Sequence, residues 1–270
     1  MKNIRLYAGL IQVSALLFIV PVLMSADQVV QSQWAAAPLS IDGQIEEWRG
    51  DTMSAQKNVG VEYALRNDGE NLYVLFIFKD PKYLSSIEMT GFTMYANISG
   101  KKDKDFAVKF IKKTVSGEEL IAYMEKQGQP LSEERKQELI AKPQFVVFEA
   151  TAINKKGEAL FPAGPVPDVD LPGFRYGQVE NQVVYELRVP LCSRDHHPTG
   201  IGVEPGKTVK LGFEWGGLTD EMRAAMRGRG GGTDWAGEKT TGSYTGQVPD
   251  VAKGPKKYSF WVDAKLASAQ

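Results

Sequence analysis

A glycine-rich loop holds the residues of this chain best suited to contact a ligand. The stretch GGGTDWAGEK places Trp235 between Asp234 and Glu238, and no amphipathic pattern there would bury the indole. A cyclic ligand can stack on an exposed aromatic face, while nearby carboxylates accept hydrogen bonds from its polar groups. We therefore predict ligand contact by Trp235, Asp234 and Glu238, with a further contribution from Trp261.

A second polar cluster lies in the stretch LCSRDHHPTG, which begins at Leu191. It contains the sole cysteine, Cys192, together with Asp195 and the only two histidines, His196 and His197. Neighbouring histidines can bind a transition metal. Adjacent side chains diverge, however, and the chain has no third histidine to complete a site, so a surface loop explains the cluster without a metal. The sequence leaves the question of a metal open.

Catalytic motifs are absent from the sequence. There is no G-x-S-x-G, and the paired carboxylates Glu46 and Glu47 are neighbours in the chain, not groups opposed across a cleft. The stretch GRGRGGGTD matches neither the P-loop nor the dinucleotide-binding fingerprint. We therefore expect a protein that is not an enzyme.

The N-terminal residues 1–26 have the pattern of a signal peptide, with Lys2 and Arg5 before an apolar run that ends in small residues. Retention as a membrane anchor is the alternative, since Met24 fits a cleavage site poorly. Cleavage would leave 30 Lys and Arg against 33 Asp and Glu and no stable membrane span. We expect an exported protein, periplasmic or extracellular, without affinity for nucleic acid. Its single cysteine allows no internal disulfide, so burial must stabilise the fold.

The positions of apolar residues predict a fold built from strands. From Val59 they repeat with period two, and in NLYVLFIFKD both faces are apolar, which predicts a central strand covered on both sides. In VVYELRVP the apolar residues alternate with Glu186 and Arg188, so we expect one face in water. The expected strands span residues 71–80, 91–99, 104–113, 143–152, 181–191, 207–216 and 256–266.

These many strands and few helices indicate an all-β fold, an antiparallel, jelly-roll-like β-sandwich. Residues 116–142 break the pattern and predict a helical insertion, with Ser132 as an N-cap and Pro143 as a stop. We interpret this insertion as a lid or packing element on the sandwich. A long loop is expected at 216–245, a short segment at 27–34, and the sandwich domain at 35–266.

Five stretches carry a recognisable pattern, namely APLSIDGQIEEW, VEYALRNDGENLYVLFIFKD, VVYELRVPL, GKTVKLGFEWG and YSFWVDAKL. Together they resemble the family 9 carbohydrate-binding-module-like domain of exported bacterial proteins, which is related to the DOMON superfamily. Within the first, Asp42-Gly43 forms a turn that tolerates positive φ, and Ile45 and Trp48 lie on one face of a helical turn. We therefore expect Trp48 to close the sandwich edge and not to touch a ligand.

The resemblance implies sugar binding and also raises cofactor questions. Some sandwiches of the superfamily hold a b-type haem, for which Met94 or His196 would be the axial ligand, although a core methionine explains Met94. The stretch Asn67 to Asn71 is a predicted hairpin turn whose carboxylates also suit calcium. We expect no cofactor, with calcium and haem as alternatives.

The sequence thus favours an exported, non-catalytic binding protein whose ligand is a glycan or polysaccharide. A periplasmic haem-binding or redox-partner sandwich is one alternative. A structural or protein-interaction domain of the cell envelope is another. The oligomeric state stays open.

Overall fold

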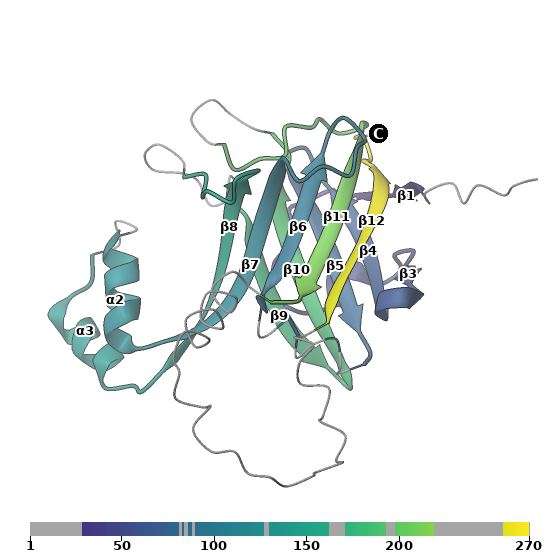
Figure 1. The fold of residues 1–270 in the computed structure, drawn as a ribbon. Coiled ribbons are helices and arrows are strands. Elements are labelled where there is room, and N and C mark those ends of the chain that lie inside the picture. Colours follow the sequence, from purple (N-terminus) through teal and green to yellow (C-terminus); the bar gives the residue numbers. More distant parts are fainter. Residues whose placement is uncertain are drawn as a thin grey trace, which may run out of the picture.

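The computed structural model describes residues 29–80, 83, 86–87, 90–126, 130–161, 171–192, 198–218 and 256–269. These residues form two β-sheets that face each other across one core (Figure 1). In order across the sheet, sheet A contains β1 (Val29–Gln31), β12 (Lys257–Lys265), β11 (Thr208–Gly216), β6 (Phe92–Asn97), β7 (Phe106–Val115) and β8 (Phe145–Asn154).

Sheet B covers the other side of the core. In order it contains β2 (Gln33–Trp34), β4 (Val61–Asn67), β5 (Asn71–Phe78), β10 (Gln182–Pro190) and β9 (Gly173–Val179), and β3 (Ser54–Gln56) also pairs with β4. Two short 3-10 helices, η1 (Glu46–Trp48) and η2 (Lys57–Val59), flank β3. The described pairings are antiparallel except for β1 with β12 and β2 with β4, so both sheets are mixed.

The structure confirms an all-β sandwich with a helical insertion. Each of the seven expected strands is present, and its ends lie within two residues of the predicted ones. Strand β4 lies in the period-two stretch that begins at Val59, although no range was given for it. The short strands β1, β2 and β3 and the strand β9 were not predicted, because none of them carries a long run of alternating apolar residues.

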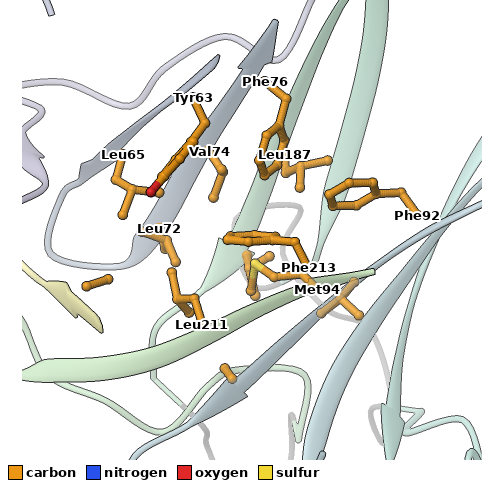
Figure 2. Close-up of a cluster of buried hydrophobic side chains, with 14 of the residues drawn as sticks. Tyr63, Leu65, Leu72, Val74, Phe76, Phe92, Met94, Leu187, Leu211 and Phe213 are labelled. Atoms are coloured by element: carbon orange, nitrogen blue, oxygen red, sulfur yellow. The ribbon is translucent and has the colours of Figure 1, made fainter. Parts of the chain in front are cut away.

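The core between the sheets is rich in aromatic side chains. Figure 2 shows Phe76 of β5 beside Leu187 of β10, with Phe92 and Phe213 contributed by sheet A. The ring centroids of Phe76 and Phe213 are 4.9 Å apart in an edge-to-face arrangement, which aromatic pairs favour. Trp215 is also buried here, as its alternation with Phe213 predicts.

Strand β5 is buried along both faces, as predicted. Its inner face contributes to the main core, while Tyr73, Leu75 and Ile77 form a second apolar cluster on the outer face of sheet B. The N-terminal segment covers this second cluster with Trp48, which is only 3% exposed. The expectation that Trp48 packs and does not face solvent is therefore confirmed.

The expectation that the outer face of β10 meets water was wrong at Glu186, which is fully buried. Its carboxylate accepts hydrogen bonds from the Trp48 indole N–H (2.7 Å) and from the backbone N–H groups of Asp42 (3.0 Å) and Gly43 (2.6 Å). Gly43 has φ +83°, the left-handed conformation expected of the Asp-Gly turn, and it lies against the backbone of Gly177 on β9. Glu186 thus fastens the turn and the tryptophan to sheet B.

A guanidinium group fixes Trp48 from a second direction. Arg66 of β4 lies over the indole at 5.6 Å and forms a two-pronged ion pair with Asp51, including an Nε–Oδ2 distance of 2.7 Å. Two charged side chains of sheet B therefore hold Trp48: Glu186 contacts its indole N–H, and Arg66 lies over its ring.

The turn between β4 and β5 is the predicted hairpin. The Asp68 carboxylate accepts hydrogen bonds from the backbone N–H groups of Glu70 (2.8 Å) and Asn71 (2.7 Å) and from the Tyr73 hydroxyl (2.7 Å). Next to it, the buried side chain of Asn67 bonds to Ala267 near the C-terminus. This corner therefore joins the hairpin to the end of the last strand.

The insertion between β7 and β8 forms two helices, α2 (Gly117–Lys126) and α3 (Glu133–Ile140). The predicted N-cap is confirmed, since Ser132 Oγ accepts a hydrogen bond from the backbone N–H of Arg135 at 3.2 Å. Figure 1 shows the helices packed together beyond the edge strand β8 and not over a sheet face. This position corrects the interpretation of the insertion as a lid or packing element on the sandwich.

Candidate functional site

The predicted ligand residues fall into two groups. Trp261 lies on β12 and is half-buried on the outer face of sheet A. Trp235, Asp234 and Glu238 lie outside the described residues. The chain from 217 to 256 that carries them joins β11 to β12, the same two strands that position Trp261. Their predicted role is not tested by the structure.

The strand register places small and aromatic residues in one row with Trp261. Trp261 pairs with Gly212 of β11, Gly212 pairs with Tyr95 of β6, and Tyr95 pairs with Ala107 of β7. Because side chains alternate along a strand, all of them lie on the outer face, opposite the core residues Phe260, Phe213 and Met94. The row therefore alternates one aromatic residue with one small residue across the sheet.

The Trp261 indole lies flat on the sheet. A Cβ built on Gly212 would meet atoms Cε2, Cε3 and Cη2 of Trp261, all at 2.7 Å. These are alternate atoms of the six-membered ring, so the Cβ position lies on the axis through the ring centre. One face of the indole thus covers Gly212, and the other faces outward from the sheet.

Tyr95 extends this aromatic surface. Its ring is tilted by only 20° from that of Trp261, with 5.9 Å between the ring centroids. Since Trp261 lies parallel to the sheet, Tyr95 lies nearly parallel to it as well. We call the surface formed by Tyr95, Gly212 and Trp261 the aromatic platform.

A group of charged side chains borders the platform at Tyr95. Lys104 Nζ lies 4.4 Å from the Tyr95 ring centroid and 2.7 Å from Glu214 Oε2. Lys257 Nζ contacts the other oxygen of Glu214 at 2.8 Å, and the Tyr95 hydroxyl donates to that same oxygen at 3.3 Å. Two ammonium groups therefore share one carboxylate beside the aromatic rings.

This arrangement shifts the ionisation of its members. Burial alone would raise the pKa of Glu214, but the two lysines more than reverse that effect, and the pKa lies below its usual value. For Tyr95, burial and the nearby charge of Glu214 raise the pKa. Burial would lower the pKa of Lys104, yet its bonds to Glu214 and Tyr95 raise it overall. At neutral pH Lys104 is thus an ammonium group and Glu214 a carboxylate.

Sequence reasoning found Trp261 but missed its neighbours Tyr95 and Gly212. Alternation within GFTMYANIS already separates Met94, which is buried, from Tyr95 on the opposite face. The position of Gly212 beneath Trp261 depends on the pairing register of β11 with β12, which no local sequence pattern specifies.

The other candidates have different positions. Met94 is fully buried in the main core, which confirms its packing role (Figure 2). Cys192 is exposed, whereas Asp195, His196 and His197 lie outside the described residues. Within the described part of the chain, no cluster of three or more His, Cys, Asp or Glu side chains is arranged to hold a metal ion. No helix among those residues is long and apolar enough to cross a bilayer.

Comparisons with known proteins give similarities of fold. No family model matches the sequence, and no curated protein matches it. A family 9 carbohydrate-binding module from Caldicellulosiruptor kristjanssonii, solved in complex with cellotriose, is 10% identical with a TM-score of 0.40, and the match covers 90% of this chain and 95% of that one. A module of this family from the same organism, in complex with glucose, is 14% identical with a TM-score of 0.30, covering 72% and 81%.

Proposed function

We propose that this chain is an exported, non-catalytic glycan-binding protein and that the aromatic platform binds the sugar. The observation that carries the proposal is the Trp261 indole lying flat over Gly212, with its second face turned outward. The C–H groups on one face of a pyranose ring stack well on such a surface.

The surroundings of the platform suit a polar, hydroxyl-rich ligand. The exposed Ser259 precedes Trp261 by two residues on the same face of β12, and Glu214 and Lys257 lie at the border. These groups offer both hydrogen-bond donors and acceptors at the edge of an apolar surface, which is the combination that sugar recognition needs. Figure 1 shows the two helices of the insertion beyond β8, at the opposite edge of sheet A from β12, and they have no part in this proposal.

Export and the contribution of the glycine-rich loop belong to the same proposal. The signal-peptide pattern of residues 1–26 supports export, and secretion of a tagged full-length chain with loss of that segment tests it. Trp235, Asp234 and Glu238 would add contacts to a sugar already stacked on Trp261. Their share is measured by Trp235→Ala in the binding experiment below.

Binding to a panel of soluble polysaccharides, measured by affinity electrophoresis and calorimetry, tests the function. We expect retention by at least one glycan and its loss in Trp261→Ala, while Trp261→Phe keeps part of the affinity because a ring face remains. Tyr123→Ala removes an exposed aromatic residue on α2 and serves as the matched control. Binding that survives Trp261→Ala unchanged would contradict the proposal.

The same preparation separates the alternative functions. A Soret band in the purified protein would favour the haem-binding sandwich, and a colourless protein with no glycan affinity that captures envelope proteins would favour an interaction domain.

A further inference from the structure

The outer face of sheet A has an excess of positive charge. Among the described residues, its strands contribute five lysines and three carboxylates, and the adjacent Lys104 and Asp105 add one charge of each sign. The strand lysines are Lys109, Lys113, Lys210, Lys257 and Lys265, and the strand carboxylates are Glu149, Glu214 and Asp263. The whole chain, in contrast, has a formal net charge of −1.

Part of this excess is concentrated beside the aromatic platform. Glu214 is shared by Lys104 and Lys257, so one ammonium group of this trio has no carboxylate of its own. Lys109 pairs with Thr93 on the strand that carries Tyr95, and the described contacts give it no ion pair. Lys210 is different, because it is buried and its Nζ lies 2.7 Å from Asp263. The available charge is therefore on the Tyr95 side of the platform.

We propose that the aromatic platform selects anionic glycans, polymers of carboxylated or sulfated sugars, over neutral ones. This inference rests on the proposed function and names its ligand class. A sugar stacked on Trp261 has the Lys104 ammonium beside it, since that group lies 4.4 Å from the centre of the adjacent Tyr95 ring. An anionic substituent of the sugar can pair with either Lys104 or Lys257, and the remaining lysine then keeps its ion pair with Glu214. Binding of such a substituent leaves none of these charges unpaired.

A neutral glycan gains only hydrogen bonds from the same lysines. Its hydroxyl groups can accept from ammonium N–H groups that Glu214 does not use, but they have no charge to pair with the excess ammonium group. The selectivity should also depend on ionic strength, because exposed charges are screened within about 10 Å at 0.1 M salt.

The test compares the purified full chain against polygalacturonate, dextran sulfate, hydroxyethylcellulose and poly-L-glutamate at low and physiological ionic strength. We expect the two anionic glycans to bind more tightly than the neutral polymer, with affinity that falls as salt rises. The stronger of the two identifies the anionic group as carboxylate or sulfate. Poly-L-glutamate has charge without sugar rings and should not show a dependence on Trp261.

Two lysines give a matched pair of variants. The side chains of Lys257 and Lys79 are 52% and 54% exposed and each contacts one glutamate, but Lys79 extends from the end of β5 in sheet B. Lys257→Gln and Lys109→Gln should each weaken binding of the anionic glycan about two- to fivefold, the range of a single exposed ion pair, and Lys79→Gln should not. Neutral-glycan binding should not change in Lys109→Gln or in Lys79→Gln.

The outcomes separate this inference from the function on which it rests. Equal affinity for the neutral polymer, still lost in Trp261→Ala, would overturn the anionic preference and keep the glycan-binding function. Failure to bind any glycan would remove both. Equal binding of poly-L-glutamate that is insensitive to Trp261→Ala would show a general affinity for polyanions and would also overturn the inference.

Discussion

Replacing Glu186 by Gln should weaken the attachment of the N-terminal segment to sheet B. The carboxylate uses one oxygen for the Trp48 indole N–H and the other for two backbone N–H groups. A glutamine must present its NH2 to one of these donor sets, so at least one buried N–H is left without an acceptor. An unsatisfied buried donor costs about 1–3 kcal/mol, and we expect Glu186→Gln to lower the free energy of unfolding by that amount.

A double-mutant cycle with Trp48→Phe isolates this bond. A glutamine keeps two bonds when its oxygen accepts from the backbone N–H groups, and its NH2 then faces the indole. The indole N–H is therefore the unpaired donor in the Glu186→Gln background, and phenylalanine removes it, so the double variant should be about 1 kcal/mol more stable than the sum of the single changes. Urea unfolding followed by circular dichroism measures all four chains. Glu70→Gln, at an exposed position, is the control for the loss of a carboxylate.

Additive effects of the two changes, within about 0.5 kcal/mol, would refute the reasoning. The pH dependence gives a second check. Burial raises the pKa of Glu186, although its three N–H donors oppose the rise. A carboxyl whose pKa is raised by folding contributes stability below its unfolded pKa and loses it as pH rises through the folded value. The wild type should therefore gain stability from this group between neutral pH and about pH 4, and Glu186→Gln should not.

Four further changes test other parts of the structure. Gly212→Ala should cost about 1–3 kcal/mol of stability and weaken glycan binding because its Cβ would collide with the indole, and the loss of stability should disappear in the Trp261→Ala background. Gly43→Ala should destabilise the fold by more than about 1 kcal/mol in thermal unfolding, since its φ is +83° and the β9 backbone lies 2.7 Å from the added Cβ. Ser132→Ala should remove about 1 kcal/mol from α3, visible as faster amide exchange in that helix and unchanged exchange in the sheets. Burial and the bond to Asp68 raise the pKa of Tyr73. The loss of stability caused by Tyr73→Phe should therefore have its full size below about pH 10 and become smaller at higher pH. Urea unfolding of both chains at neutral and alkaline pH measures this difference.

The sequence predicted those parts of the fold that local periodicity determines. Strand β5 was recognised as central because apolar residues occupy both of its faces, and Trp48 was assigned to packing from its spacing with Ile45. The capping of α3 by Ser132 was also predicted correctly. The capping box at the start of α2 was not predicted. There the side chains of Ser116 and Glu119 each accept a hydrogen bond from the other residue's backbone N–H.

Features that depend on contacts between distant segments were not predicted. Glu186 looked like a solvent-facing position because it alternates with apolar residues, and only the return of residues 42–48 across sheet B buries it. The same limit applies to the platform, where Tyr95, Gly212 and Trp261 are far apart in the chain and become one surface through the register of three strands. A one-residue slip of that register would turn Trp261 into the core and destroy the surface.

The two tryptophans Trp48 and Trp261 show how similar residues acquire opposite roles in one sandwich. Each lies on the outer face of a sheet, but Trp48 is covered by its own segment and donates its N–H to a buried carboxylate. Trp261 has a glycine beneath it and no such donor–acceptor bond in the described contacts, so its ring is held by the sheet on one face alone. Since stability requires the first arrangement and ligand access requires the second, substitutions of Trp48 should act on unfolding and substitutions of Trp261 on binding.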